Sequence, residues 1–258
     1  MSVQVDLDNF FGPDALVEAY YRYKESKTDR YDPQRIRICT GADGVTWQNF
    51  ERGLEPRVQA ISRLVLDGSY RFFPMREVVF DKPGGGVRIV SVASIRDVLV
   101  HRQLYEALYN QAERVFRVEG ARAVSFAYRR GKSAALAAQR IWESIQGGYR
   151  YAYEADIRSF FDTLSHSRLM SLIDSWLGPE TVPRTLLWRY IRTDRVPHDS
   201  YPGGDELEKH FMTNKPVRVP RLAGVPQGGA LSGLLANLYL HEFDRWVLED
   251  LGSRLDMR

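Results

Sequence analysis

Cysteine is almost absent from this chain, because Cys39 is the sole cysteine among 258 residues. A single cysteine excludes an internal disulfide and a zinc site built from several thiolates. Its scarcity favours a reducing compartment, and the cytoplasm is the expected location.

Long apolar runs are lacking as well. The first residues, M-S-V-Q-V-D-L-D, have neither the basic start nor the apolar stretch of a signal peptide. No apolar run approaches the roughly 20 residues that a membrane-spanning helix needs. The composition is 44% hydrophobic, 27% charged and 12% aromatic, which is typical of a folded protein with a core of normal size. We expect one large domain or two small ones.

Charge of one sign is barely in excess, since the formal net charge is +3. The 36 basic residues include 6 Lys, which leaves 30 Arg. Arginine binds phosphate in a bidentate fork and stacks on bases better than lysine does. A high-GC genome enriches arginine for a different reason, so the composition permits a nucleic-acid partner without requiring one.

Several common catalytic motifs are missing. The G-K-S at 131–133 lacks the upstream glycine of a phosphate-binding P-loop, because Phe126 stands there. The run G-G-G-V-R-I has Ile89 where a dinucleotide fingerprint needs its last glycine. The five histidines are scattered without an H-E-x-x-H motif, and no G-x-S-x-G elbow occurs.

The spacing of apolar residues predicts a largely helical chain with one β-hairpin. R-E-V-V-F and V-R-I-V-S-V flank the turn signal D-K-P-G-G-G, so we predict a hairpin over about 76–92. One predicted helix, over 14–24, places Leu16, Ala19, Tyr20 and Tyr23 near helical spacing. Thr46 is the predicted N-cap of a short helix over 46–50. Further helices are predicted over 55–67, 95–116, 132–146, 167–177 and 180–191, and after the turn that begins at Gly224.

Two other stretches have distinct patterns. Y-R-Y-A-Y-E-A-D (149–156) alternates, with Tyr149, Tyr151 and Tyr153 on one side, so it is predicted to be a strand that ends at Asp156. Residues 193–223 contain four prolines and little periodicity, which predicts mostly loop.

Four separated segments, taken in order, resemble those of group II intron-type reverse transcriptases. They are G-A-D-G-V-T-W-Q-N-F (41–50) with L-V-L-D-G-S-Y-R (64–71), K-P-G-G-G-V-R-I-V-S-V-A-S-I-R-D-V-L-V (82–100), S-F-A-Y-R-R-G-K-S-A (125–134) with A-D-I-R-S-F-F-D-T-L-S-H (155–166), and G-V-P-Q-G-G-A-L-S-G-L-L-A-N-L-Y-L (224–240). The resemblance spans roughly residues 41–249. D-I-R-S-F-F-D and P-Q-G-G-A-L-S in this order are its most specific parts.

The resemblance implies the fingers and palm of a right-hand polymerase. We therefore expect an α+β fold with helix-rich fingers and an incomplete antiparallel palm sheet. The expected organisation is an N-terminal arm and helix over 1–40, fingers over 41–148, and a partial palm over 149–258.

The implied activity is RNA-directed DNA synthesis with dNTPs, an RNA template and a DNA primer. Nucleotidyl transfer uses two Mg²⁺ ions about 3.5–4 Å apart, and such ions prefer carboxylate oxygens. The resemblance assigns metal binding to Asp156, with help from the backbone carbonyl of Ile157. Glu154 is expected to be a solvated carboxylate, and Asp162 to cap or pair locally.

The resemblance also assigns the nucleotide and nucleic-acid contacts. Lys82 and Arg88 correspond to fingertip cations that grip the incoming triphosphate. Phe161 corresponds to the residue beneath the nucleotide sugar, where a ring excludes a 2′-hydroxyl, whereas Phe160 is the better core candidate. Gln227 corresponds to a residue that touches the nucleotide near its sugar.

Two short runs are expected to contact template or primer. Gly228 and Gly229 would let the backbone approach the base pair closely. Arg129, Arg130 and Lys132 are predicted to contact phosphates, with a solvated basic surface as the alternative.

The defining aromatic-x-Asp-Asp motif of the family does not occur in the 258 residues, which end in L-G-S-R-L-D-M-R. We therefore expect a fragment that is inactive alone and that needs a second polypeptide or a C-terminal region to complete the palm and thumb. Ser91-Val92-Ala93 replaces the commoner Gly-Ile-Pro, and Gly233 replaces the usual Pro. Two alternatives remain: a non-catalytic nucleic-acid-binding or scaffolding module, and template-independent DNA synthesis, in an antiviral or CRISPR-linked system.

Overall fold

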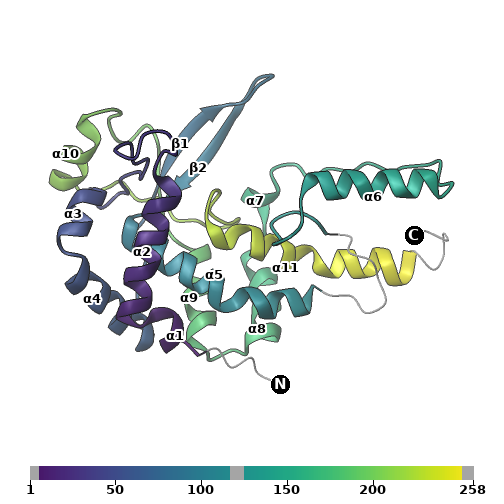
Figure 1. Ribbon diagram of the computed structural model, residues 1–258, viewed down its shortest axis with the longest axis horizontal. Coiled ribbons are helices and arrows are strands. Elements are labelled where there is room, and N and C mark those ends of the chain that lie inside the picture. The colour runs from purple at the N-terminus through teal and green to yellow at the C-terminus, as the bar shows by residue number, and fades with distance from the viewer. Residues whose placement is uncertain (1–5, 117–124, 252–258) are drawn as a thin grey trace.

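Helices dominate the molecule, of which the computed structural model describes residues 6–116 and 125–251 (Figure 1). The helices before the hairpin are α1 (Asp8–Phe11), α2 (Pro13–Lys27), α3 (Trp47–Arg52) and α4 (Leu54–Leu66). Those after it are α5 (Ile95–Val115), α6 (Ala134–Gln146), α7 (Phe160–Thr163), α8 (His166–Leu177), α9 (Val182–Ile191), α10 (Glu206–Thr213) and α11 (Ala230–Trp246), which continues into a short π-helix (Val247–Leu251). Within the described ranges, no helix is both long enough and apolar enough to cross a bilayer.

Three strands form one small mixed sheet in the order β2-β1-β3. The strands are β1 (Met75–Asp81), β2 (Val87–Val92) and β3 (Arg195–Val196). β1 and β2 pair antiparallel, so the hairpin predicted over 76–92 is confirmed, and β3 adds a short parallel edge to β1. The helix-rich α+β class is also confirmed, with a sheet that is mixed rather than wholly antiparallel.

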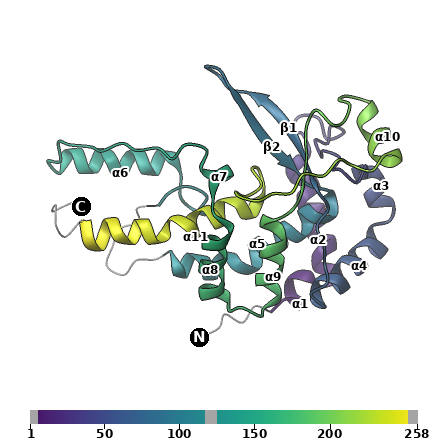
Figure 2. The same ribbon diagram turned by 180° about the vertical axis from the view of Figure 1, so that it is seen from behind.

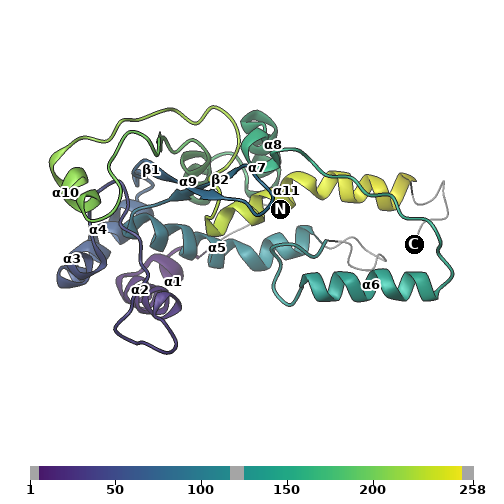
Figure 3. The ribbon, with the colours of Figure 1, turned by 90° about the horizontal axis from the view of Figure 1, so that it is seen from above.

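The core gathers around α5, which lies between the N-terminal helices and α11 (Figures 1 and 3). Val100, Leu104 and Leu108 of α5 recur at every fourth position and are fully buried. The apolar face predicted on α2, which consists of Leu16, Ala19, Tyr20 and Tyr23, is buried as well. Helical periodicity in the sequence therefore identified the sides of these helices that pack together.

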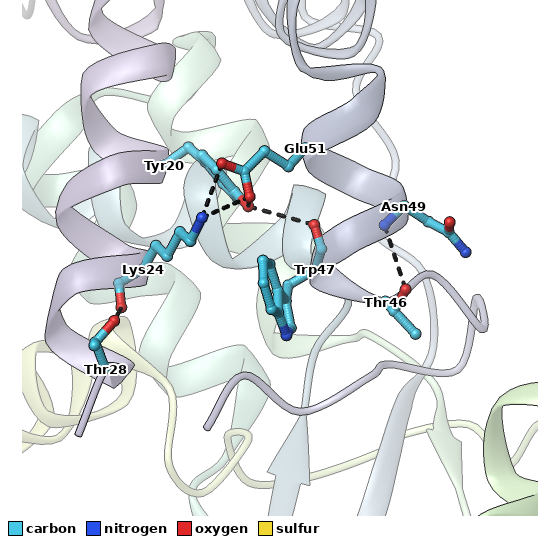
Figure 4. A network of polar contacts seen from close by, with 7 residues as sticks. All are labelled: Tyr20, Lys24, Thr28, Thr46, Trp47, Asn49 and Glu51. Carbon is cyan, nitrogen blue, oxygen red and sulfur yellow. Dashed lines mark hydrogen bonds and ion pairs between the residues drawn. The ribbon is translucent and has the colours of Figure 1, made fainter. Parts of the chain in front are cut away.

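Polar contacts join α2 to α3 (Figure 4). Lys24 Nζ lies 2.7 and 2.8 Å from the two oxygens of the Glu51 carboxylate. The Tyr20 hydroxyl donates to the same carboxylate at 3.3 Å, and burial together with this negative charge raises the pKa of Tyr20. The Thr46 hydroxyl accepts from the Asn49 N–H at 3.3 Å, which confirms Thr46 as the N-cap of α3.

The segment 149–156, predicted to be a palm strand, is not a strand in this structure. It runs from the end of α6 back toward α7 (Figure 3), and Tyr151 and Tyr153 are 98% and 95% exposed. Alternation marks a segment that is able to pair, but a strand forms only where another strand supplies partners for its N–H and C=O groups. Within the described residues nothing pairs with it.

Residues 193–223 are more ordered than the predicted loop, since they contain β3 and α10. Phe211 of α10, Val196 of β3 and Ala42 form a second, small buried cluster. The Tyr201 hydroxyl donates to the backbone carbonyl of Glu77 on β1. Residues 193–223 therefore pack against the base of the hairpin and support it. Their glycine-rich and proline-rich sequence does not predict this tertiary role.

Helix α6 lies apart from the main body and runs alongside α11 (Figures 1 and 2). None of its residues is buried, although Ile141, Trp142 and Ile145 form an apolar stripe at helical spacing. An amphipathic helix usually covers such a stripe with a partner. Among the described residues, no partner buries this one.

Candidate functional site

Two segments far apart in the sequence are joined by backbone hydrogen bonds. The Val225 N–H donates to the Phe161 carbonyl at 2.7 Å, and the Gly224 N–H donates to the Leu164 carbonyl at 2.8 Å. Gly224 has a φ of +75°, and a Cβ there would lie 2.5 Å from the Phe161 oxygen, so only glycine fits. The D-I-R-S-F-F-D turn and the P-Q-G loop therefore form one unit.

The P-Q-G loop also contacts the hairpin. The Ser91 N–H on β2 donates to the Gln227 carbonyl at 2.9 Å. Gly228 follows with a φ of +93°, and a Cβ there would lie 2.9 Å from Val90 Cγ1. Three of the segments that carry the family resemblance thus meet at one place.

The side chain of Gln227 is oriented by Asp162. Its Nε2 donates to both oxygens of the Asp162 carboxylate at 3.1 Å. Asp162 thus pairs with a residue distant in the sequence, where local pairing or capping was expected. The Gln227 Oε1 makes no hydrogen bond within the described part of the chain, so it is a free acceptor on this unit.

Asp156 and Ile157 are exposed, in the stretch just before the turn. Neither the Asp156 carboxylate nor the Ile157 carbonyl is hydrogen-bonded to another described residue. These are the oxygen ligands that a hard divalent cation prefers, so the donor types fit one such ion. Across residues 6–116 and 125–251, no three His, Cys, Asp or Glu side chains gather, and the ligands for a pair of ions are not assembled there.

The ring of Phe161 is half-buried beside the P-Q-G loop. It meets the Phe160 ring at 5.7 Å and the Tyr128 ring at 5.8 Å, both edge-on. Phe160 packs further against Tyr239, at 6.2 Å between ring centroids. Both phenylalanines pack against the core, and the proposed contact of Phe161 with the nucleotide sugar stays a prediction.

Lys82 and Arg88 lie on the hairpin as predicted, and both are exposed. Neither side chain has an ion pair or hydrogen bond among the described residues. Because side chains alternate along a strand, Arg88 shares a face of β2 with Val90 and Val92. A cation without a carboxylate partner on this face is available to an anionic ligand.

That face of the hairpin forms one wall of a cavity of about 590 Å³. Parts of α2, α5 and the P-Q-G loop supply the other walls. Its cations and rings include Tyr23, Lys27, Arg37, Arg76, Phe80, Arg102 and Tyr105. None of them was assigned a binding or catalytic role from the sequence. The helical spacings of Tyr23 with Lys27 and of Arg102 with Tyr105 were signals that could have paired them.

His101 lies at the buried side of this cavity. Its ring packs between Phe72, at 4.9 Å, and Tyr190, at 4.7 Å between centroids. Burial lowers the pKa of His101 to about 3, and its Nε2 has no hydrogen-bond partner among the residues that the structure describes. The imidazole is therefore neutral in the folded protein at physiological pH.

Gly229 serves the packing of the P-Q-G loop. A Cβ there would lie 2.2 Å from the Tyr190 hydroxyl, which hydrogen-bonds Ser232 Oγ at 2.7 Å. Ser232 in turn donates to the Pro226 carbonyl. This contact explains the glycine by protein packing, whereas its predicted approach to a base pair stays a prediction.

The basic run differs from the prediction at Arg129. The Arg129 side chain is 7% exposed, and its guanidinium binds the Glu113 carboxylate at 2.7 and 2.9 Å. Arg130 pairs with Glu106 at 2.6 Å but keeps an exposed guanidinium. Lys132 has no ion pair within the described residues and lies 5.7 Å from the Phe126 ring centroid. Arg129 is therefore engaged in an ion pair within the protein, whereas Arg130 and Lys132 stay accessible to a ligand.

Comparisons with known proteins match the part of the chain that contains strand β2 of the hairpin, the D-I-R-S-F-F-D turn and the P-Q-G loop. The family described as reverse transcriptase (RNA-dependent DNA polymerase) matches residues 80–255. Protein YkfC of Escherichia coli (strain K12) is 27% identical over 81% of this chain and 50% of its own length. Group II intron-encoded protein LtrA of Lactococcus lactis subsp. cremoris is 28% identical over 76% of this chain and 29% of its own. The chain spans half or less of the length of these relatives.

Solved structures share the fold. A chain of a partial Cas6-RT-Cas1–Cas2 complex superposes with a TM-score of 0.51 at 20% identity, over 98% of this chain and 35% of its own length. A chain of a Cas6-RT-Cas1–Cas2 complex matches with the same TM-score, over 98% of this chain and 22% of its own. At this identity the likeness concerns the architecture alone.

Proposed function

Because the chain belongs to the reverse transcriptase family, we propose that it forms the nucleotide-binding and template-binding part of an RNA-directed DNA polymerase of the group II intron type. The observation that carries the proposal is the hydrogen-bonded unit of turn, P-Q-G loop and hairpin. It joins the segments of Asp156, Gln227 and Arg88, which are far apart in the sequence. These are the segments that hold metal, sugar and triphosphate in the proposed reaction.

Asp156 and the carbonyl of Ile157 are the proposed ligands of Mg²⁺. Metal held there would supply positive charge for activation of the primer 3′-oxygen and for stabilisation of the departing pyrophosphate. Arg88 and Lys82 are proposed to neutralise the triphosphate from the hairpin. Their exposed positive charges can form charge-assisted hydrogen bonds with its phosphate oxygens.

Phe161 and Gln227 are proposed to read the sugar of the incoming nucleotide. The Phe161 ring occupies the space of a 2′-hydroxyl and so favours deoxynucleotides. Asp162 holds the Gln227 amide N–H groups, which leaves Oε1 to accept a hydrogen bond from the sugar. Gly228 and Gly229 of the P-Q-G loop, together with Arg130 and Lys132, are the proposed contacts to template or primer.

A further polypeptide segment completes the palm in this proposal, because no aromatic-x-Asp-Asp motif occurs in the 258 residues. Two described features suit such a segment. Within residues 6–116 and 125–251, the backbone of 149–156 has no strand partner and the apolar stripe of α6 is uncovered. A strand pair with an apolar face would satisfy both.

Primer extension on an RNA template with a DNA primer, dNTPs and Mg²⁺ tests the proposal. We expect no synthesis by the 258-residue chain alone and synthesis by an assembly that adds the aromatic-x-Asp-Asp pair. In that assembly Asp156→Asn should abolish synthesis and leave template affinity within about twofold, since the amide keeps the shape and loses the charge. Asp199→Asn, an exposed aspartate elsewhere, is the matched control.

Three results would contradict the proposal in different ways. Strong dNTP incorporation by the chain alone would refute the need for an added Asp-Asp pair. Equal loss of RNA affinity and synthesis in Asp156→Asn would assign Asp156 a structural role. Absence of synthesis in every assembly that contains the chain would refute polymerase activity altogether.

A second candidate function is a non-catalytic nucleic-acid-binding module. It is favoured by the isolation of Asp156, which lies in no cluster of carboxylates within the described residues. RNA binding without synthesis in any assembly would support it. Incorporation that persists after the template is omitted would instead indicate template-independent synthesis.

A further inference from the structure

Tyr128 has a backbone conformation that is unusual for a bulky residue. Its φ is +57°, in the left-handed region that large side chains disfavour. Its side chain is 59% exposed, and its hydroxyl has no hydrogen bond among the described residues. Neither burial nor a polar contact of the hydroxyl accounts for the strain.

The Tyr128 ring packs against helix α11 at Gly233. A Cβ on Gly233 would lie 2.4 Å from Tyr128 Cγ, so the ring lies directly on the helix backbone. Glycine inside a helix is destabilising, which makes this close approach a reason for its presence. Further along α11, the Asn237 side-chain amide donates to the Ala127 carbonyl at 2.9 Å and holds the same turn in place.

The Tyr128 ring then meets Phe161. Their centroids are 5.8 Å apart at an interplanar angle of 87°, an edge-on geometry that aromatic pairs prefer. On its other side Phe161 contacts Phe160, at 5.7 Å. Phe161 is therefore held between the core and an exposed tyrosine that is itself held against α11.

We propose that Tyr128 is a positioning residue that fixes the ring of Phe161 and thereby sets the choice between deoxyribonucleotides and ribonucleotides. The inference rests on the proposed function, in which Phe161 excludes the 2′-hydroxyl. Steric exclusion discriminates only if the excluding ring cannot turn aside. Tyr128 closes the solvent side toward which the Phe161 ring would otherwise move, and the contact with Gly233 keeps Tyr128 there.

Single-nucleotide extension with dNTP and rNTP in parallel tests this in the polymerising assembly that contains the chain. Tyr128→Ala removes the ring, and Gly233→Ala displaces it from the opposite element. Both should raise rNTP use relative to dNTP use by roughly 3- to 10-fold, the range for loss of one edge-on ring pair. The gain should come mainly from a lower KM for rNTP, because a clash is removed.

Further variants separate this role from folding. Tyr128→Phe keeps the ring and should retain the wild-type selectivity, whereas Tyr128→Gly relieves the positive φ and should match Tyr128→Ala. Tyr31→Ala, which truncates an exposed tyrosine outside the site, is the control and should leave selectivity unchanged. In a Phe161→Ala background, Tyr128→Ala should add nothing, since Tyr128 acts through that ring.

The outcomes distinguish the inference from the function on which it rests. Unchanged selectivity in both Tyr128→Ala and Gly233→Ala, with normal dNTP synthesis, overturns the inference and leaves the polymerase standing. A further effect of Tyr128→Ala without the Phe161 ring shows direct contact with the nucleotide and also overturns it. Absence of synthesis by the wild-type assembly overturns both.

Discussion

At the scale of single residues, buried polar groups connect the elements around the site. Asp97 is fully buried at the start of α5, where it accepts hydrogen bonds from the Tyr70 hydroxyl at 2.6 Å, the Phe73 N–H at 2.8 Å and the Ser94 hydroxyl at 2.8 Å. Burial raises the pKa of Asp97 to about 6 despite these bonds. This carboxylate ties α5 to the segment that leads into the hairpin.

His101 should make stability depend on pH. Burial lowers its pKa from 6.5 to about 3, so between these values the unfolded chain binds a proton that the folded protein does not. The contribution of His101 to the free energy of unfolding is complete above about pH 6.5. It decreases as the pH is lowered, by roughly 2 kcal/mol at pH 5. The raised pKa of Asp97 acts in the opposite direction between its unfolded value of 3.8 and about 6.

His101→Phe separates the two effects. The new ring fits between Phe72 and Tyr190 and cannot be protonated. Urea unfolding at about pH 7.5 and pH 5 should show a loss of stability on acidification that is about 2 kcal/mol smaller in the variant. Asp97 is present in both proteins, so its contribution cancels. The same loss in both would mean that His101 can be protonated in the folded state.

At the scale of elements, the loop that leads into α6 is fastened to α5 by arginines. Arg129 binds Glu113, and the Arg130 guanidinium lies 4.2 Å from the Tyr109 ring centroid while pairing with Glu106. A run that appears in the sequence as one basic patch therefore contains a structural residue and accessible ones. The buried pair sets where the loop, and with it Tyr128, lies.

Arg129→Ala and Lys132→Ala should have different effects. Arg129→Ala leaves the Glu113 carboxylate without this partner and should lower the free energy of unfolding by about 2–4 kcal/mol. Lys132→Ala should hardly change stability but should reduce the salt dependence of RNA binding by about one phosphate contact. Chemical denaturation and RNA titrations at several salt concentrations measure both. A reduced salt slope in Arg129→Ala, with unchanged stability, would assign Arg129 to RNA instead.

At the scale of the whole molecule, the net charge is only +3, yet several cations gather around the cavity beneath the hairpin. Lys27 of α2 and Arg102 of α5 reach the cavity beneath the hairpin from different elements. Tyr23, Phe80 and Tyr105 line the same cavity, and the Arg102 guanidinium lies 5.3 Å from the Tyr23 ring centroid. Cations and stacking surfaces in one groove suit a single-stranded nucleic acid.

The affinity for single-stranded RNA should therefore fall steeply with salt. Lys27→Gln and Arg102→Gln should each reduce the slope of log affinity against log salt by about 0.7, the value for one phosphate contact on a single strand. Arg30→Gln, which removes the same charge from an exposed loop outside the cavity, is the control. Equal slopes for all three variants would place the RNA elsewhere on the molecule.

The sequence by itself determined the features that depend on near neighbours in the chain. Helical periodicity located α2, α5, α6, α8 and α9, the glycine turn located the hairpin, and Thr46 capped α3 as predicted. The order of the family motifs identified the segments of the site. Each of these signals is local, because a turn, a cap or an amphipathic face is set by residues within a few positions.

The tertiary structure alone decided which distant side chains meet. It paired Gln227 with Asp162, enclosed Arg129 with Glu113, and set Tyr128 against Gly233. It also left 149–156 without a strand partner in the described part of the chain, although the alternating pattern predicted a strand. A strand, a buried ion pair and a close ring contact each need a partner from elsewhere in the chain, and local periodicity does not specify that partner.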